Sequence, residues 1–508
     1  MPLLNKLPIE LVMRIISMLD WRGLVACSQV CIALHNVITQ SAKFQYAIEL
    51  VVAGMQDGQS SEMVYAEKLA QLREHQVAWR SLRWRSERVV KMLNGGVWEL
   101  YGGVLAHARS WNTLVFDQLP SEIRGIPEDS WELTPADIRS IRDFAIEPAF
   151  DLLVIVETAA YISSESHRIH LRSMRTGTKH DRASAPGVLT HTLPGTQLSF
   201  AIQICGQYLG VLFISNDVQE SQLVVWDWQT GAREMALRGH MIGSFGFVDQ
   251  EHVLLGTIRG HKPLLQVINF KKSPNEVVSI EEADYACVFH CPPLRPEATT
   301  LAISVRSDPA PGWEPNPALQ VPFYTAPKER LFAITIWISE RAVVHTLLLF
   351  IPFSTITSRL VAPIAEGHRR DFGWDEWGPT GSRLMKAPGG HSMVWVCYIS
   401  GTSWIGPQYT PEYEEPPIGP KAIQILDFNQ LAIRRDSTQG GHSDVTEVNL
   451  TETVLELDDV FLHTVITRLP YRKRTINVPR HQNSTYNAVM LNEDSIVTVT
   501  SVCLNMFV

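Results

Sequence analysis

Apolar residues near the start of the chain recur with helical spacing. Leu11, Ile15 and Leu19 follow one another at intervals of four residues, and further apolar residues lie beside them. Side chains three or four residues apart share one face of an α-helix. Pro8 suits the first turn of a helix, because its ring fixes φ and its missing N–H costs nothing there. The pattern predicts an amphipathic helix that opens at Pro8.

A second apolar stripe follows after an interruption at residues 20–23. Its members alternate in steps of three and four residues, and they are Leu24, Cys27, Cys31, Leu34 and Ile38. Short helices of this kind enclose little core of their own. We therefore expect part of their apolar surface to bind another chain. The alternative is that these helices cap the remainder of the fold.

Residues 60–84 continue the helical pattern, as one long helix or two, with a mixed charged face. Tryptophans and arginines alternate at the end of this segment, between Trp79 and Arg85. Such a cluster could bind nucleic acid. The interpretation that we favour is an anchor, because tryptophan rings and arginine stems commonly pack a helix onto a neighbouring domain.

From Gly95 onward the pattern changes to short apolar runs with a period of two, separated by turn residues. One such strand is predicted over 97–105. Many short strands with frequent turns are typical of a β-sandwich, a barrel or a propeller. The sequence thus predicts an α + β multidomain chain. It has an all-α segment at 1–45, a helical linker at 46–94 and a large all-β domain at 95–508.

A repeated turn favours the propeller among these β folds. An apolar strand at 223–226 leads into Asp227, and the turn after it ends in Thr230-Gly231. This resembles the turn between the third and fourth strands of a WD-repeat blade, where Asp and Thr accept hydrogen bonds from turn amides and Gly supplies a positive φ. A weaker copy ends at Gly177, 54 residues earlier, and Asp427 lies 200 residues after Asp227, close to four such periods. We expect an irregular WD-like β-propeller of six to eight blades, with a pair of sandwiches as the alternative.

The N-terminal stretch as a whole resembles the F-box. The resemblance rests on Leu7-Pro8, Glu10-Leu11, the apolar helix that ends at Leu19-Asp20, Leu24 and Val30-Cys31. The family usually has Trp where this chain has Leu34, and often Pro where it has Trp21. Further similarity to fungal F-box proteins extends over much of the chain, at 79–82, 95–100, 143–148, 170–177, 204–206 and 378–383.

The resemblance implies a role for the chain. It would be the substrate-recognition adaptor of an SCF-type (Skp–cullin–F-box) E3 ubiquitin ligase, without catalytic residues of its own. Its partners would be a Skp-type adaptor, a cullin reached through that adaptor, and an unidentified protein substrate. The residues implied to bind the Skp-type adaptor are Leu7, Pro8, Ile9, Leu11, Val12, Ile15, Leu24, Val30 and Leu34.

Aromatic loops of the β-domain are the candidates for substrate binding. Loops on one face of a propeller commonly form its binding surface. The segments at 367–390 and 401–420 are rich in aromatic residues, Gly and Pro. The predicted substrate-binding residues are Trp374, Trp377, Trp404 and Tyr409.

Composition excludes several functional classes. The net charge of −9 gives no footprint for nucleic acid. The longest apolar run, 342–353, is too short to span a bilayer, so no membrane association is expected. Seven cysteines, an odd number, favour reduced thiols over a disulfide framework. With no signal peptide before the first helix, we expect a cytoplasmic or nuclear location.

Motifs for catalysis or cofactor binding are weak. Cys287, His290 and Cys291 could ligate zinc, but a second ligand pair at regular spacing is missing, so we interpret the cysteines as core residues and expect no metal and no cofactor. Two alternatives to a ligase adaptor stay open. One is a β-propeller interaction scaffold unconnected with ubiquitin. The other is a propeller hydrolase with carboxylates at its central channel or in the acidic loop at 412–415.

Overall fold

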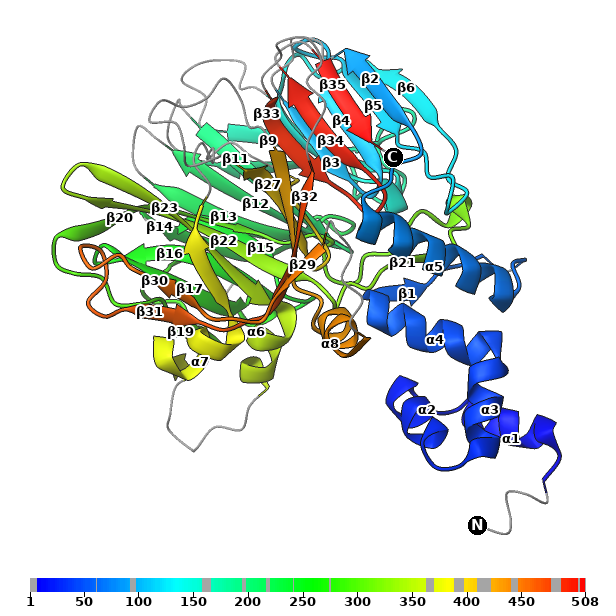
Figure 1. The fold of residues 1–508 in the computed structure, drawn as a ribbon. Coiled ribbons are helices and arrows are strands. Elements are labelled where there is room, and N and C mark those ends of the chain that lie inside the picture. The colour runs from blue at the N-terminus through cyan, green and yellow to red at the C-terminus, as the bar shows by residue number, and fades with distance from the viewer. Residues whose placement is uncertain are drawn as a thin grey trace.

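The computed structural model describes residues 7–60, 62–91, 97–157, 166–193, 198–215, 220–240, 242–273, 276–361, 370–387, 397–408, 422–439, 446–476, 486–500 and 503–507. The chain forms an arm of helices that projects from one side of a large ring of β-sheets (Figure 1). The arm is the N-terminal part of the chain, and the ring contains most of the remainder.

The described residues of the arm form five helices and one short strand. They are α1 (Ile9–Ile16), α2 (Trp21–Ser28), α3 (Ile32–Gln40), α4 (Ala42–Ala53), β1 (Met55–Asp57) and α5 (Tyr65–Ser81). Asp20 begins α2, because its carboxylate accepts a hydrogen bond from the Gly23 amide at 2.8 Å. Gly54 ends α4 with a φ of 69°, which favours glycine. Helix α1 ends at Ile16, three residues before Leu19, and the second predicted apolar stripe is divided between α2 and α3.

The described residues of the ring form seven sheets of four or five strands each. The first sheet contains β3 (Trp98–Tyr101), β4 (Val104–Ala108), β5 (Leu114–Gln118) and β6 (Asp129–Leu133), and the second contains β7 (Ile141–Glu147), β8 (Leu152–Glu157), β9 (Ser166–Ser173) and β10 (Val188–Thr192). The third contains β11 (Leu198–Cys205), β12 (Tyr208–Ser215), β13 (Ser221–Asp227), β14 (Arg233–Gly239) and β18 (Val277–Ser279). The fourth contains β15 (Ile242–Phe247), β16 (His252–Arg259), β17 (Lys262–Asn269), β19 (Cys287–His290) and β24 (Asp371–Phe372).

The last three sheets complete the ring. The fifth sheet contains β20 (Ala298–Arg306), β22 (Leu331–Glu340), β23 (Val343–Pro352) and β25 (Arg383–Lys386). The sixth contains β26 (Ile399–Ser400), β27 (Ser403–Gln408), β28 (Ala422–Asp427), β32 (Tyr471–Ile476) and β29 (Thr446–Asn449). The seventh contains β33 (Tyr486–Leu491), β34 (Ile496–Thr500), β35 (Cys503–Phe507) and β2 (Glu87–Lys91). Two-stranded sheets join β1 to β21 (Phe323–Thr325) and β30 (Thr453–Leu455) to β31 (Val465–Thr467). Helices α6 (Phe353–Leu360), α7 (Trp374–Gly381) and α8 (Gln430–Gln439) are inserted between strands.

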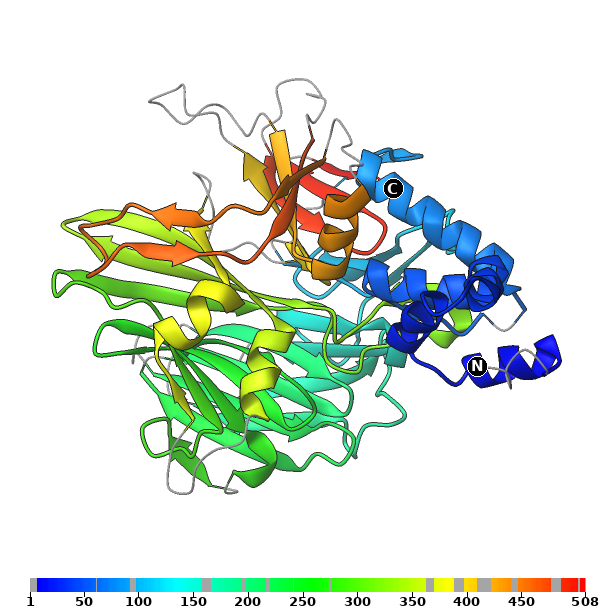
Figure 2. The same cartoon turned by 60° about the horizontal axis from the view of Figure 1, so that its bottom comes forward.

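Hydrophobic clusters join each sheet to the next around the ring. One cluster packs β4 and β5 against β7 and β8, and further clusters bridge each of the following pairs of sheets. The last cluster packs β33 and β34 against β3 and β4, so the final sheet meets the first (Figure 2). Sheets packed face to face in a closed circle make a β-propeller. The predicted β-propeller is confirmed, and the alternative, a pair of β-sandwiches, is wrong.

The ring is closed by a strand from the N-terminal side of the chain. β2 pairs antiparallel with β35, with Glu87 opposite Phe507 and Lys91 opposite Cys503. Because β2 lies at 87–91, a part of the predicted linker at 46–94 belongs to the propeller. A strand paired this way removes a free edge and ties the two ends of the propeller segment together.

The predicted repeat turn lies where the sequence placed it. After β13, the third strand of its sheet, the Asp227 carboxylate accepts hydrogen bonds from the amides of Gln229 (2.9 Å) and Thr230 (3.1 Å). Gly231 has a φ of 77°, and Gly177 after β9 has a φ of 69°. Asp427 ends β28, also a third strand, but only three sheets after Asp227. Inserted segments lengthen the later sheets, so the 200 residues between the two aspartates span three sheets and not the four that a period of 54 residues predicts.

A glycine pair divides one predicted strand. Residues 97–105 contain the whole of β3, a turn and the start of β4, since Gly102 (φ 56°) and Gly103 (φ 79°) make a two-residue hairpin turn. No helix among the described residues is long and apolar enough to cross a membrane.

We expect ring closure to contribute strongly to stability. Deleting residues 501–508 removes β35 and leaves β2 and β34 without their shared neighbour. The melting temperature should fall by about 5 °C or more, because a strand's backbone pairing and its packing are lost together. Thermal unfolding followed by circular dichroism measures this. An unchanged melting temperature would show that the β2–β35 pairing does not hold the ring closed.

Candidate functional site

The first three helices carry apolar side chains that face solvent. Ile9 is 50% exposed, Leu11 46%, Ile15 51% and Ile32 80%. Solvent-exposed apolar residues of this kind mark interaction surfaces when they are contiguous. We call the following set the apolar face: Leu7, Ile9, Leu11, Met13, Ile15, Met18, Leu19, Val30 and Ile32.

Helix α1 is apolar on more of its circumference than it can bury. Val12 and Ile16 point into the arm and are 6% and 3% exposed. At 100° per residue, Leu11 and Ile15 lie on one flank of this buried pair. Ile9 and Met13 lie on the other flank in the same way. A helix that keeps apolar side chains on both flanks of its buried stripe has surface left for a partner.

The apolar face stands away from the propeller. Among the described residues, the core beneath it draws only on positions 12 to 48, with Val12, Ile16, Leu24, Ile38 and Phe44 at its centre. Helices α2 and α3 contact each other and α4. Figure 1 shows α1, α2 and α3 at the outer end of the arm. These helices therefore do not cap the ring of sheets.

The structure divides the predicted adaptor-binding residues into two groups. Leu7, Pro8, Ile9, Leu11, Ile15 and Val30 are exposed. Val12 and Leu24 are buried in the core of the arm, and Leu34 packs partly against it. These three side chains support the helices from inside and do not form part of the exposed surface.

Four members of the apolar face were not predicted: Met13, Met18, Leu19 and Ile32. The spacing of apolar residues shows that α1 is amphipathic. It does not show which of two adjacent apolar stripes turns inward, and only the packing of α2, α3 and α4 decides that.

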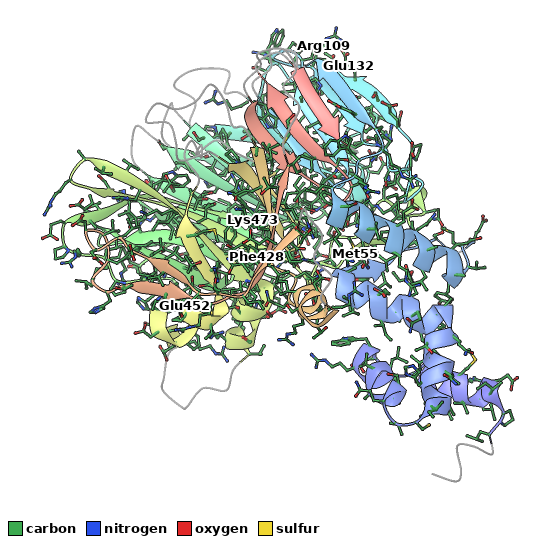
Figure 3. All side chains as sticks on the ribbon, in the orientation of Figure 1. Met55, Arg109, Glu132, Phe428, Glu452 and Lys473 are labelled. Atoms are coloured by element: carbon green, nitrogen blue, oxygen red, sulfur yellow. The ribbon has the colours of Figure 1, made fainter. Side chains whose placement is uncertain are left out.

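Buried polar contacts fix the arm to the propeller. Strand β1 pairs with β21, with Met55, labelled in Figure 3, opposite Thr325. The Tyr46 hydroxyl donates a hydrogen bond to the Pro322 carbonyl at 2.7 Å, across 276 residues of sequence. The ring of Tyr46 packs with Leu50, Leu69, Leu72 and Phe323 in one hydrophobic cluster. We call this boundary between arm and ring the seam.

Helix α5 adds a second set of seam contacts. The Trp79 indole N–H donates to the Glu493 carbonyl at 2.9 Å, and the His75 ring nitrogen lies 3.0 Å from the same oxygen. Trp79 also packs against a core cluster of the propeller. The Asn429 side chain donates to the Val52 carbonyl at 2.9 Å. The prediction that the Trp79 cluster anchors a helix to a neighbouring domain is confirmed.

The predicted substrate-binding tryptophans lie in the core. Trp377 and Trp404 are fully buried and Trp374 is 8% exposed. Trp374 and Trp377 pack edge to face, and the Trp377 indole N–H donates to the His290 carbonyl at 3.0 Å. The rings of Trp377 and Trp404 are enclosed in core clusters, whereas Trp374 also lines a cavity together with His290 and Asp371. Tyr409 lies outside the described residues.

A central cavity of about 260 Å³ lies among the first strands of the sheets. Its lining includes Glu99 on β3, Asp143 on β7, Arg306 on β20 and the nearby Asp308. Burial and the neighbouring Asp143 raise the pKa of Glu99 to about 8, and burial raises that of Asp143 to about 6. Burial thus favours the protonated form of these carboxyl groups, and Arg306 on the same lining acts in the opposite direction by lowering both pKa values.

The predicted core role of the cysteines agrees with their surroundings. Cys287 is fully buried, Cys291 is 7% exposed, and both belong to one hydrophobic cluster. Burial raises the pKa of both thiols to about 12, which keeps them protonated. In the part of the chain that the structure describes, no group of three His, Cys, Asp or Glu side chains could hold a metal ion.

No protein-family model and no curated protein matches this sequence. Similar solved structures include the WD40 domain of Toxoplasma gondii coronin, with 8% identity, a TM-score of 0.43, and coverage of 84% of this chain and 85% of that one. The WD40 domain of SCAP from fission yeast has 9% identity, a TM-score of 0.32, and coverage of 81% and 84%.

A third solved structure is Chaetomium thermophilum Sqt1 bound to the N-terminus of the ribosomal protein L10. It has 10% identity, a TM-score of 0.31, and coverage of 80% of each chain. At these scores the likeness carries no argument about function. The assignment of the propeller rests on this chain's own sheets and their closed order.

We expect the Tyr46 hydroxyl to be important for the seam. Tyr46→Phe removes one of two donors to the Pro322 carbonyl, because the Gly58 amide still donates to it at 2.9 Å, so the free energy of unfolding should fall by about 0.5–1.5 kcal/mol. Tyr65→Phe is the control, since Tyr65 packs beside Tyr46 but is 41% exposed; its effect should stay within about 0.5 kcal/mol. Denaturant unfolding measures both. Equal effects would contradict a special role for Tyr46.

We expect two buried carboxyls, Glu99 in the central cavity and Glu147 at the end of β7, to make stability fall as pH rises above 7. Glu99 and Glu147 have pKa values raised by burial to about 8, against 4.5 ordinarily. Because the folded chain keeps protons that the unfolded chain has already released, stability decreases up to about pH 8. The fall in stability is measured from pH 7 upward, where the buried histidines do not contribute to it. Burial lowers the pKa values of His107, His167, His170 and His191, so these side chains are already neutral in the folded chain at pH 7.

Glu99→Gln should therefore flatten the decrease in melting temperature between pH 7 and 8.5. The control is Glu297→Gln, at an exposed position outside the cavity. If Glu99→Gln and the parent chain gave parallel melting curves across this range, Glu99 would not carry the raised pKa.

Proposed function

We propose that the chain is the substrate-recognition subunit of an SCF-type E3 ubiquitin ligase. Its helices α1, α2 and α3 would bind a Skp-type adaptor and, through it, a cullin. Its β-propeller would bind the protein to be modified. The observation that supports this proposal is the apolar face, which is exposed at the far end of the arm and coincides with the F-box-like stretch of sequence.

The apolar face offers a partner several half-exposed apolar side chains to cover. Covering a side chain that is about half exposed yields roughly 1 kcal/mol. Leu7, Ile9, Leu11 and Ile15 lie within nine residues of one another, and Val30 and Ile32 add to them. The sum has to exceed an association cost of about 4–15 kcal/mol. A continuous apolar surface can do so, whereas scattered exposed side chains cannot.

The rigid seam suits a recognition subunit. A ligase of this class acts by holding its target near a ubiquitin-charged enzyme, so its contribution is proximity and orientation. A flexible arm would spread the target over many positions. Here β1, α4 and α5 are tied to the ring by backbone pairing and buried hydrogen bonds. An adaptor bound at the outer end of the arm would therefore hold a fixed orientation relative to the propeller.

The alternative is a propeller scaffold without a link to ubiquitin. One form of it treats the N-terminal helices as a cap on the ring, and the position of the apolar face disfavours that form. The other form gives the apolar face a different protein partner. A propeller is suited to binding proteins in either case.

We expect Leu11→Asp with Ile15→Asp to abolish adaptor binding. Both side chains are exposed, so the double variant should fold normally. It removes two apolar contacts and introduces two charges that the complex would bury, which should weaken binding by about 100-fold or more. The affinity of the full chain for a purified Skp-type adaptor, measured by isothermal titration calorimetry, provides the test.

The matched control is Val343→Asp with Val344→Asp. These two residues are each 54% exposed and lie at the start of β23, in the propeller. The control should bind the adaptor as the parent chain does. Undiminished binding by the arm variant, or no binding by the parent chain, would overturn the proposal.

A further inference from the structure

A polar cavity lies at the seam between the arm and the propeller. Its volume is about 120 Å³, enough for several waters or one small ion. Its lining comes from the end of α4, from α5 and α8, and from β28 and β32. Figure 3 labels Lys473 on β32 and Phe428 directly after β28. Residues next to these two, Arg472, Arg474 and Asp427, line the cavity.

Two buried arginines line this cavity from β32. Arg472 and Arg474 are two residues apart and therefore point to the same face of the strand. They are 7% and 5% exposed. Arg472 contacts the Asp427 carboxylate and donates to Asp436 on α8 at 2.9 Å. Arg474 reaches Asp427 only at 3.4 Å, and its Nε has no hydrogen-bond partner among the described residues.

The cluster holds more positive than negative charge. Arg80 on α5 lies 3.6 Å from Asp436, so three guanidinium groups share the carboxylates of Asp427 and Asp436. Burial alone would raise the pKa of Asp427, but Arg472 and Arg474 outweigh it and lower the pKa to about 2. Asp427 is therefore already ionised, and its charge is shared by two arginines. Among these five side chains, the three guanidinium groups outnumber the two carboxylates by one.

Arg474 bears most of this imbalance. Burial and then the neighbouring Arg472 lower its pKa to about 10. The group stays charged at neutral pH, but in an environment that disfavours the charge. Two other carboxyls, those of Glu493 and Glu329, also line the cavity. The Glu493 carboxylate lies 2.6 Å from Arg124, which it shares with Asp494, and burial raises the pKa of Glu329, which favours its neutral form.

We infer that the seam cavity is a binding site for a small tetrahedral oxyanion, phosphate or sulfate, held by Arg474 with Arg472 and Arg80. Guanidinium groups match oxyanions in charge and in hydrogen-bond geometry. The side chain of Arg80 is 39% exposed, which gives the cluster an opening to solvent. Ser403 and Asn492 on the lining supply further donors.

Binding at this site would strengthen the seam. The arginines come from α5 on the arm and from β32 on the ring, so one anion would contact both parts. A ligand that binds only the folded chain raises its stability by mass action. This inference is independent of the proposed ligase role, because it concerns the seam and not the apolar face.

The experiment adds inorganic phosphate to the full chain at constant ionic strength, with chloride as the reference salt. At about ten times its dissociation constant, phosphate should raise the melting temperature by about 1–3 °C. Arg474→Gln should abolish this shift. Arg109→Gln is the control, because Arg109 forms an exposed ion pair with Glu132 at 2.6 Å on the outer part of the first sheet, far from the seam (Figure 3).

Isothermal titration calorimetry with inorganic phosphate gives a second measurement, and one site per chain is expected. If Arg474→Gln does not fold, Arg80→Gln at the opening should weaken phosphate binding at least fivefold. A phosphate shift that is equal in Arg474→Gln and in the parent chain would overturn the assignment. So would the absence of any heat of binding in the parent chain.

Discussion

The seam is the constraint on which the arrangement of the molecule depends. A five-helix arm has little core of its own, and the part nearest the ring becomes stable by sharing Phe323 and the β1–β21 pairing with the propeller. The Tyr46 hydroxyl and the Gly58 amide donate hydrogen bonds to the Pro322 carbonyl of the ring, and the Trp79 indole N–H donates to the Glu493 carbonyl. An unsatisfied buried polar group costs about 1–3 kcal/mol, so these contacts favour one orientation of the arm over all others.

The propeller in turn depends on closure. Each sheet buries both faces only when it has a neighbour on either side, and the clusters that join consecutive sheets require a complete ring. Pairing β35 with β2 places the closing strand directly after the arm in sequence. The same segment that ends the arm thus completes the ring, and arm and ring are joined by two routes, through β2 and through the seam.

Local patterns made the fold predictable, and long-range packing limited the prediction of the site. The Asp227 turn could be predicted because its carboxylate and Gly231 act within five residues. The apolar stripe of α1 was visible, but the choice between Val12 and Leu11 as the buried residue is made by α4, through Phe44. Trp374 and Trp404 lie in or beside segments rich in glycine and proline, which predicted surface loops, yet their rings are buried by neighbouring sheets. The Arg472–Arg474 cluster was not predicted, because Arg80 and Asp436 join it only through the tertiary fold.

The central claim is that the apolar face of the arm is the surface that binds a Skp-type adaptor. Amide hydrogen exchange of the full chain, with and without the purified adaptor, tests it most directly. The account predicts added protection over residues 9–19 and 28–34, with little change in the sheets of the propeller. Protection confined to the propeller, or none at saturating adaptor, would contradict it.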